Sequence, residues 1–133
     1  METKLGLQKG YVMIADQNLT ANFADLGGPI DMHGNQGVVF WLDVEVGTST
    51  NIQIRAKAMF SENGEEGEFD FPIETINASL DKINPLVFEL TSLADQKILL
   101  TVNTGNQIPF IKIQVKDSAG GSGKIKAAYY SKS

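Results

Sequence analysis

The strongest constraint on the fold comes from residues 51–60, NIQIRAKAMF, where apolar residues alternate with polar or charged ones. From Ile52 to Phe60 every second side chain is apolar, and most of the side chains between them are polar or charged. A period of two is typical of a β-strand that buries one face and exposes the other. The sequence therefore predicts a half-buried strand here, with the side chains of Ile52, Ile54 and Phe60 in the core.

Similar short runs recur along the chain and are separated by turn segments such as QNLT, ENGEEG, TGNQ and SAGGSG. Gly and Asn adopt positive φ at little cost, so these segments favour tight turns. About nine short strands at intervals of about 8–12 residues predict an all-β protein, an antiparallel β-sandwich for which a jelly roll is one connectivity. We expect a single domain over residues 1–133. The candidate strands are residues 11–15, 19–26, 38–46, 52–60, 68–74, 86–90, 97–103, 108–116 and 124–130.

One segment, ETINASLDKINP at residues 74–85, allows two interpretations. Ile76, Leu80 and Ile83 fall at helical spacing, and Pro85 would end a short helix. The alternative is a loop followed by a strand that leads into residues 86–90. The sequence therefore predicts at most one short helix, near residues 76–83.

The last run, residues 124–130, needs neighbours, because an unpaired β edge invites aggregation. We expect it to lie inside a sheet, between residues 108–116 and an early strand such as residues 11–15. The alternative is an edge position guarded by Lys124 and Lys126, which a second copy or a partner completes. The link GTST, residues 47–50, likewise has the length of a hairpin turn between its flanking runs.

Alternation also assigns the core. Phe40 and Trp41 must point to opposite faces of their strand, and burial of Trp41 is favoured because aromatic side chains at strand centres usually pack. In the last run the pattern places Tyr129 inward and Tyr130 outward. The side chains expected to be buried are Val39, Trp41 or its neighbour Phe40, Val44, Ile52, Ile54, Phe60, Phe71, Phe88, Leu99, Ile111, Ile113 and Ile125.

Charge and composition exclude several classes of protein. The formal net charge is −5, whereas nucleic-acid and anionic-membrane binding need a dominant basic surface. Cysteine is absent, which excludes a disulfide framework and a thiolate metal site. The N-terminal residues METKLGLQKGYVM have no apolar signal-peptide core, and no run approaches the length of about 20 apolar residues that a membrane helix needs. We expect a protein made in the cytoplasm, with no nucleic-acid or membrane partner.

No motif predicts catalysis. His33 is the sole histidine and lies in the stretch GGPIDMHGNQG, where a lone histidine is usually a hydrogen-bonded structural residue. The same stretch lacks the Lys and Ser/Thr of a phosphate-binding loop. Acidic residues recur on many strands, but none stands out as a catalytic pair. We therefore expect a protein that is not an enzyme, with no catalytic residue, no cofactor and no metal.

An acidic cluster occupies residues 62–70, ENGEEGEFD, which contain no basic residue. We expect a mobile, solvent-exposed hairpin tip without a tightly held metal, since mutual repulsion is uncompensated. A calcium site is the alternative, but the D-x-D-x-D-G spacing of a calcium loop is missing. The acids are Glu62, Glu65, Glu66, Glu68 and Asp70.

A basic cluster lies in the last two runs, where alternation turns several lysines outward. Basic side chains on an acidic protein suit docking against carboxylates, either on a partner or on the acidic cluster of a neighbouring copy. The candidate docking face is Lys112, Lys116, Lys124, Lys126 and Tyr130, and the acidic cluster is its candidate counter-surface.

The C-terminal part of the chain combines a D-Q-K lead into an apolar strand, an I-P-F strand, a Gly/Ala/Ser-rich link and a last strand of small and aromatic residues. On these features residues 36–133 resemble small all-β structural proteins of tailed bacteriophages. The resemblance implies a virion component of the capsid-decoration, head–tail or tail type, which forms homo-oligomers and docks on other virion proteins. No catalytic residues come with it. The alternative function is a carbohydrate-binding β-sandwich module that would use Trp41 or exposed tyrosines.

Overall fold

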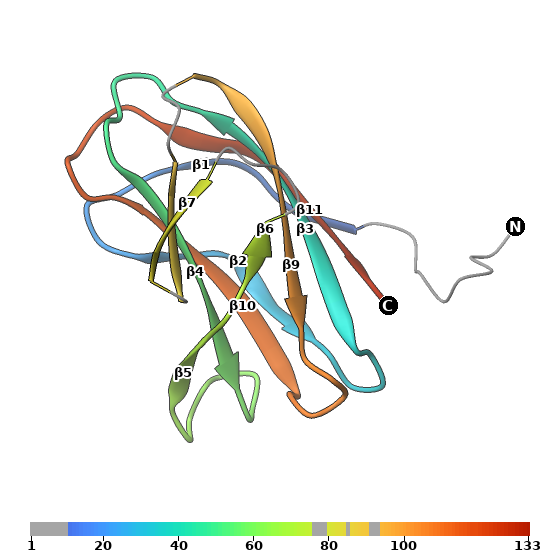
Figure 1. The fold of residues 1–133 in the computed structure, drawn as a ribbon. Coiled ribbons are helices and arrows are strands. Elements are labelled where there is room, and N and C mark those ends of the chain that lie inside the picture. The colour runs from blue at the N-terminus through green and yellow to red at the C-terminus, as the bar shows by residue number, and fades with distance from the viewer. Residues whose placement is uncertain (1–10, 76–79, 85, 91–93) are drawn as a thin grey trace, which may run out of the picture.

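The computed structural model describes residues 11–75, 80–84, 86–90 and 94–133 (Figure 1). These residues form two antiparallel β-sheets packed face to face and contain no helix. The predicted all-β, antiparallel sandwich is confirmed. The strands are β1 (Tyr11–Asn18), β2 (Ala24–Asp31), β3 (Gly37–Glu45), β4 (Ile52–Met59), β5 (Glu68–Phe71), β6 (Glu74–Thr75), β7 (Leu80–Asn84), β8 (Val87–Leu90), β9 (Gln96–Asn103), β10 (Phe110–Asp117) and β11 (Lys124–Lys132).

The strand order is that of a jelly roll. One sheet is five-stranded, with the order β1-β11-β3-β9-β6, and the other is six-stranded, with the order β2-β10-β4-β8-β7 and β5 paired to β4. The chain crosses from one sheet to the other at each step from β1 to β4, and again from β8 to β11. Two such sets of alternating strands are the pattern of a double-sheet jelly roll. Strands β5, β6 and β7 are an insertion between these two sets.

The core lies between the sheets and is built from aliphatic side chains and two phenylalanines, Phe40 and Phe88. Phe40, Ile54 and Ile113 are fully buried, and each such side chain contributes about 1.5–3 kcal/mol relative to exposure. The predicted core positions that the structure confirms as buried are Phe40, Val44, Ile52, Ile54, Phe88, Ile111, Ile113 and Ile125.

Strand β3 corrects the favoured placement of Trp41. Val38, Phe40, Leu42 and Val44 all face the core, so Trp41 points outward and is 51% exposed. Val39 is only half-buried for the same reason. Val39 and Val44 differ by an odd number of positions, so a strand with a strict period of two cannot bury both.

Three other predicted core residues are less buried than expected. Phe60 lies just beyond the end of β4 and is 70% exposed, whereas Ala58 is the last residue of that strand in the core. Leu99 is half-buried, since its neighbours Ile98 and Leu100 occupy the core face of β9. Phe71 is half-buried and packs against the edge of the core.

Two predicted hairpins are crossings between the sheets. The link at residues 47–50 joins β3 to β4, which belong to different sheets, and β10 and β11 are likewise in different sheets (Figure 1). Strand β11 lies between β1 and β3, so its interior position and its pairing with β1 are confirmed, whereas its pairing with β10 is wrong. Short links rich in Gly and Ser look alike whether they turn within a sheet or between sheets.

The segment with two interpretations is a strand over residues 80–84, which pair with β8 as β7. A helix over that part of residues 76–83 is therefore wrong, and residues 76–79 lie outside the described residues.

A β-bulge in β11 reverses the expected orientation of its last tyrosines. The register with β3 shifts between Ile125 and Ala127, so Ala128 faces the core and Tyr129 faces outward. Tyr129 is 44% exposed, whereas Tyr130 is half-buried and packs against the core. A bulge adds one residue to a strand and so inverts the alternation beyond it.

Candidate functional site

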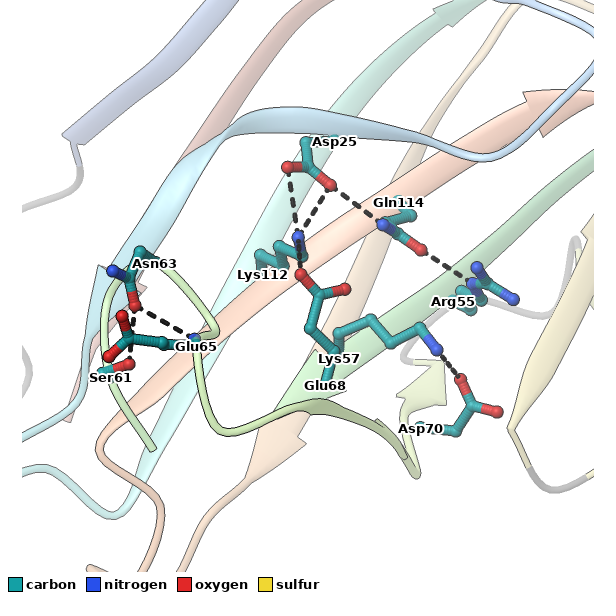
Figure 2. Close-up of polar contacts among 10 residues, drawn as sticks. All are labelled: Asp25, Arg55, Lys57, Ser61, Asn63, Glu65, Glu68, Asp70, Lys112 and Gln114. Atoms are coloured by element: carbon teal, nitrogen blue, oxygen red, sulfur yellow. Dashed lines mark hydrogen bonds and ion pairs between the residues drawn. The ribbon is translucent and has the colours of Figure 1, made fainter. Parts of the chain in front are cut away.

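The outer face of the six-stranded sheet centres on Lys112, which β10 places between β2 and β4. The Lys112 ammonium lies 2.7 Å from Glu68 Oε2 and 3.1 Å from Asp25 Oδ1 (Figure 2). Lys112 faces outward from the core, as predicted, but with 7% of its surface exposed it is buried under its neighbours and is not available for docking. Its methylene stem is covered, and its charge is matched within the chain.

The ionisation of this cluster follows from its contacts. Burial lowers the pKa of Lys112, but hydrogen bonds to Glu68 and Asp25 outweigh that effect and raise the pKa above 10.5. Partial burial opposes ionisation of Asp25, yet hydrogen bonds from Gln114 and Lys112 hold its pKa below 3.8. Both groups are charged at neutral pH.

The network extends along β4 and β10. Gln114 Nε2 donates to Asp25 Oδ1 at 2.9 Å, and Arg55 Nε donates to Gln114 Oε1 at 2.8 Å (Figure 2). Lys57 lies directly opposite Lys112 in the sheet and forms a 2.7 Å ion pair with Asp70. The cations Arg55, Lys57 and Lys112 thus lie near three acids, namely Asp25 from β2 and Glu68 and Asp70 from β5. The charged side chains at the centre of this face are already engaged by other side chains of the same chain.

The five residues of the candidate docking face do not form one surface. Lys112 and Lys116 belong to the six-stranded sheet, whereas Lys124, Lys126 and Tyr130 belong to the five-stranded sheet. The Lys116 ammonium lies 4.7 Å from the centre of the Phe23 ring. Lys124 pairs with Asp16 at 2.9 Å and with Glu45 at 3.9 Å, while Lys126 is exposed.

The five residues of the candidate acidic counter-surface also fall into two groups. Glu68 and Asp70 pair with lysines of the same chain, which corrects the expectation that repulsion among these acids is uncompensated. Glu62, Glu65 and Glu66 remain exposed at the end of the molecule, in the tip, defined here as residues 60–69. The mobility expected of this segment stays a prediction.

The tip is built from two consecutive turns. The Gly64 N–H donates to the Ser61 carbonyl at 3.0 Å, and the Gly67 N–H donates to the Gly64 carbonyl at 2.9 Å. Both glycines have positive φ, which side-chain-bearing residues rarely adopt. The Ser61 hydroxyl donates to Glu66 Oε1 at 2.6 Å. Within the described ranges, no three His, Asp or Glu side chains gather as a metal ion would require.

Two exposed phenylalanines flank these turns and form the tip patch. Phe60 is 70% and Phe69 64% exposed, and they border a shallow hollow of about 210 Å³. Ile108 and Pro109, from the loop before β10, line its other side. The exposure of Phe60 was missed from the sequence because it continues the apolar alternation of β4. Its position one residue beyond the strand is the signal that distinguishes it.

A second exposed aromatic site lies on the five-stranded sheet. Tyr129, Trp41 and Leu99 are directly opposite one another on β11, β3 and β9. They line a hollow of about 500 Å³, called here the aromatic hollow. Asp43 and Lys97, which also face each other across β3 and β9, form one end of it.

His33 is engaged in local contacts. Its Nδ1 lies 2.6 Å from Asp31 Oδ1, and its ring meets the Phe110 ring edge-on at 5.5 Å between centroids. The Asp31 side chain also accepts the His33 backbone N–H, and these two hydrogen bonds lower the pKa of Asp31. The interaction orders the bend that follows β2.

Comparison with known proteins gives a similarity in fold. No protein-family model matches the chain, and no curated protein matches it. Among solved structures, the crystal structure of the SPBc2 prophage-derived protein YomS is similar, with a TM-score of 0.55 at 11% sequence identity. The match covers 93% of this chain and 90% of that protein. The chain therefore shares its fold with a prophage-derived protein along almost its whole length. Over the described residues, no helix has the length and apolar character that crossing a membrane requires.

Proposed function

We propose that this protein is a non-enzymatic structural component of a bacteriophage particle, which associates with itself and docks on other virion proteins. The observation that carries the proposal is the similarity in fold to a prophage-derived protein, because it spans both chains nearly end to end. Capsid decoration, a head–tail connection and a tail position are all compatible with a domain of this size.

The tip supports docking on another virion protein. Phe60 and Phe69 present two aromatic side chains to solvent at one end of the sandwich, next to exposed Glu62 and Glu65. Aromatic anchors surrounded by a polar rim are typical of the centres of protein interfaces. The partner surface that fits has an apolar pocket with basic residues around it. Lys57, Lys112 and Lys124 of this chain suit that role poorly, since they already pair with its own acids.

The first experiment tests the virion role itself. Particles are purified from an induced lysate of the host strain, and peptides of this chain are measured by mass spectrometry relative to the other particle proteins. We expect the chain to co-purify with particles at a fixed stoichiometry. A chain that is abundant in the lysate but absent from particles would refute the proposal.

The second experiment tests the tip as the docking surface. The double variant Phe60→Ser with Phe69→Ser should reduce incorporation into particles by about tenfold or more, because truncating an aromatic anchor costs roughly 2 kcal/mol or more. Val12→Ser is the matched control, since Val12 is 68% exposed on β1, in the other sheet. Equal incorporation of both variants would remove the tip from the interface and leave the virion role standing.

A further inference from the structure

The aromatic hollow places two exposed aromatic side chains next to each other in the middle of a sheet. Tyr129 and Trp41 are directly opposite on β11 and β3, and they are 44% and 51% exposed. An aromatic side chain at a strand centre normally gains stability by burial, so an exposed pair marks a binding surface. Leu99 continues the row on β9. The result is a row of apolar side chains that crosses three strands and lines the hollow.

The shape of the surface suits a small ligand. Its hollow of about 500 Å³ lies within the range of roughly 300–1,000 Å³ typical of small-molecule sites. The hollow beside Phe60 and Phe69 is less than half as large, at about 210 Å³, and no charged side chain lines it. Only the larger hollow joins aromatic side chains with charged hydrogen-bonding groups.

The polar end of the hollow indicates the chemistry of the ligand. Asp43 and Lys97 are cross-strand partners and both line the hollow, so it contains one acceptor carboxylate and one donor ammonium. Their charges offset each other. A phosphate or nucleic-acid ligand would require net positive charge, and a cationic ligand would require net negative charge. A neutral ligand with one apolar face and several hydroxyl groups fits this arrangement.

We propose that the aromatic hollow binds a neutral saccharide. The apolar C–H face of a sugar ring stacks on Trp41 and Tyr129, and its hydroxyls exchange hydrogen bonds with Asp43 and Lys97. This site is independent of the tip and of the virion role, because it lies on the other sheet and uses none of the tip residues.

The sequence supplies its own reporter for the test. Trp41 is the only tryptophan, so the intrinsic fluorescence of the intact protein reports on the hollow directly. The protein is titrated with three neutral oligosaccharides, namely maltohexaose, cellohexaose and chitohexaose. We expect a saturable change in Trp41 emission with at least one of them. The absence of any change with all three, up to about 10 mM, overturns the proposal, since weaker binding corresponds to less than roughly 3 kcal/mol.

Variants distinguish ring stacking from general apolar contact. Tyr129→Leu and Trp41→Leu keep apolar area but remove the flat ring, and we expect each to weaken saccharide binding by about tenfold or more in calorimetry. Phe69→Ala is the matched control, because Phe69 is even more exposed than Trp41 and Tyr129 but lies at the tip, and this variant should bind as the unmodified protein does. Circular dichroism verifies that each variant is folded. Full binding by a folded Tyr129→Leu variant overturns the proposal.

A different occupant of the same face would give a different result. If Tyr129→Ala and Trp41→Ala disrupt self-association while no oligosaccharide binds, the face is an interface with a second copy and the saccharide proposal is wrong. Mass photometry of the same variants measures that outcome. The presence of the chain in particles is measured separately, so failure of the saccharide site and failure of the virion role are distinguishable.

Discussion

Gly121, in the link between β10 and β11, lies against the turn that follows β3. A Cβ at this position would be 2.7 Å from both the backbone N and the Cα of Ser49, and 2.8 Å from Asp117 Oδ2. Backbone atoms cannot move aside as a flexible side chain can. The Gly-rich link is therefore required for close packing of two crossings between the sheets, in addition to any freedom that it gives the chain.

Substitution of this glycine should destabilise the protein. We expect Gly121→Ala to lower the free energy of unfolding by about 1–3 kcal/mol, the usual range for an overpacked site. Gly28→Ala is the control, because no atom lies within 4 Å of the position its Cβ would occupy. Urea denaturation of the two variants measures the difference. Equal midpoints would show that the link moves away from Ser49 without loss of stability.

The charge of Lys112 is a second residue-scale determinant of stability. Lys112→Glu would place a third carboxylate beside Asp25 and Glu68 in a site where Lys112 is only 7% exposed. We expect a loss of about 2–3 kcal/mol, below the usual value for a broken buried pair because both acids are partly exposed. Lys126→Glu, at an exposed position, should leave the melting temperature unchanged. A Lys112→Glu variant as stable as Lys126→Glu would contradict the importance of this cluster.

At the scale of elements, β11 holds the five-stranded sheet together. It pairs with β1 from Tyr11 to Asn18 and with β3 on its other side. Beyond it, the Ser133 N–H donates to the Gly37 carbonyl at 3.0 Å, and the Ser133 carbonyl accepts the Gln36 N–H at 2.7 Å.

Deletion of residues 124–133 should therefore unfold the domain, because it removes two ladders and the buried side chains of Ile125 and Ala128. The measurement is the loss of the cooperative thermal transition followed by circular dichroism. Deletion of residues 131–133 alone is the milder control, and it should lower the melting temperature while keeping the transition. A cooperative transition in the larger deletion would show that the remaining strands suffice.

The existence of the strands is predictable from the sequence, but their partners are not. Alternation identifies β4, β9 and β10 because burial of one face imposes a period of two. The alternation contains no information about which strands are neighbours in a sheet. For this reason β10 and β11, adjacent in the chain, were expected to pair, although they lie in different sheets. The bulge after Ile125 has no signal in the alternation either, and it exchanges the orientations of Tyr129 and Tyr130.

The candidate surfaces were only partly predictable for a related reason. Lys112 occupies an outward position on its strand, as alternation requires, but its burial depends on Asp25 and Glu68 from distant strands. The carbohydrate alternative required an exposed aromatic side chain, and Trp41 is one. From the sequence its burial was favoured, because aromatic side chains at strand centres usually pack. The burial of Lys112 and the exposure of Trp41 both depend on which strands lie next to each other. No local sequence pattern contains that information.

The two outer faces of the whole molecule differ in character. The six-stranded sheet is covered by ion pairs, whereas the five-stranded sheet exposes Val12, Trp41 and Tyr129. The first face contributes to stability and makes stability depend on pH. A hydrogen bond from Lys57 lowers the pKa of Asp70, and hydrogen bonds from Gln114 and Lys112 outweigh partial burial to lower that of Asp25.

Acid should therefore destabilise the protein. Carboxyl groups with a lowered pKa in the folded state contribute stability that is fully present above their ordinary value of 3.8. That stability is lost as the pH falls below 3.8 through the folded-state pKa. We expect the melting temperature to fall across this window, and Asp25→Asn to make the fall shallower while lowering the melting temperature at neutral pH. Thermal scans across the acid range measure both effects, and identical pH profiles for the two proteins would contradict this role of Asp25.

The position of β11 also fixes when the molecule can fold during translation. The ribosome synthesises β11, which lies between β1 and β3, after the other strands of the five-stranded sheet, so β1 has no partner in its sheet until residues 124–132 emerge. Translation adds about 5–20 residues per second, so β11 is synthesised on the order of ten seconds after β3. During that time one edge of β3 has no hydrogen-bonding partner. An open strand edge recruits other chains, and a nascent chain on a crowded polysome has many within reach. We therefore expect slower translation of residues 46–123 to lower the yield of folded protein in the cell.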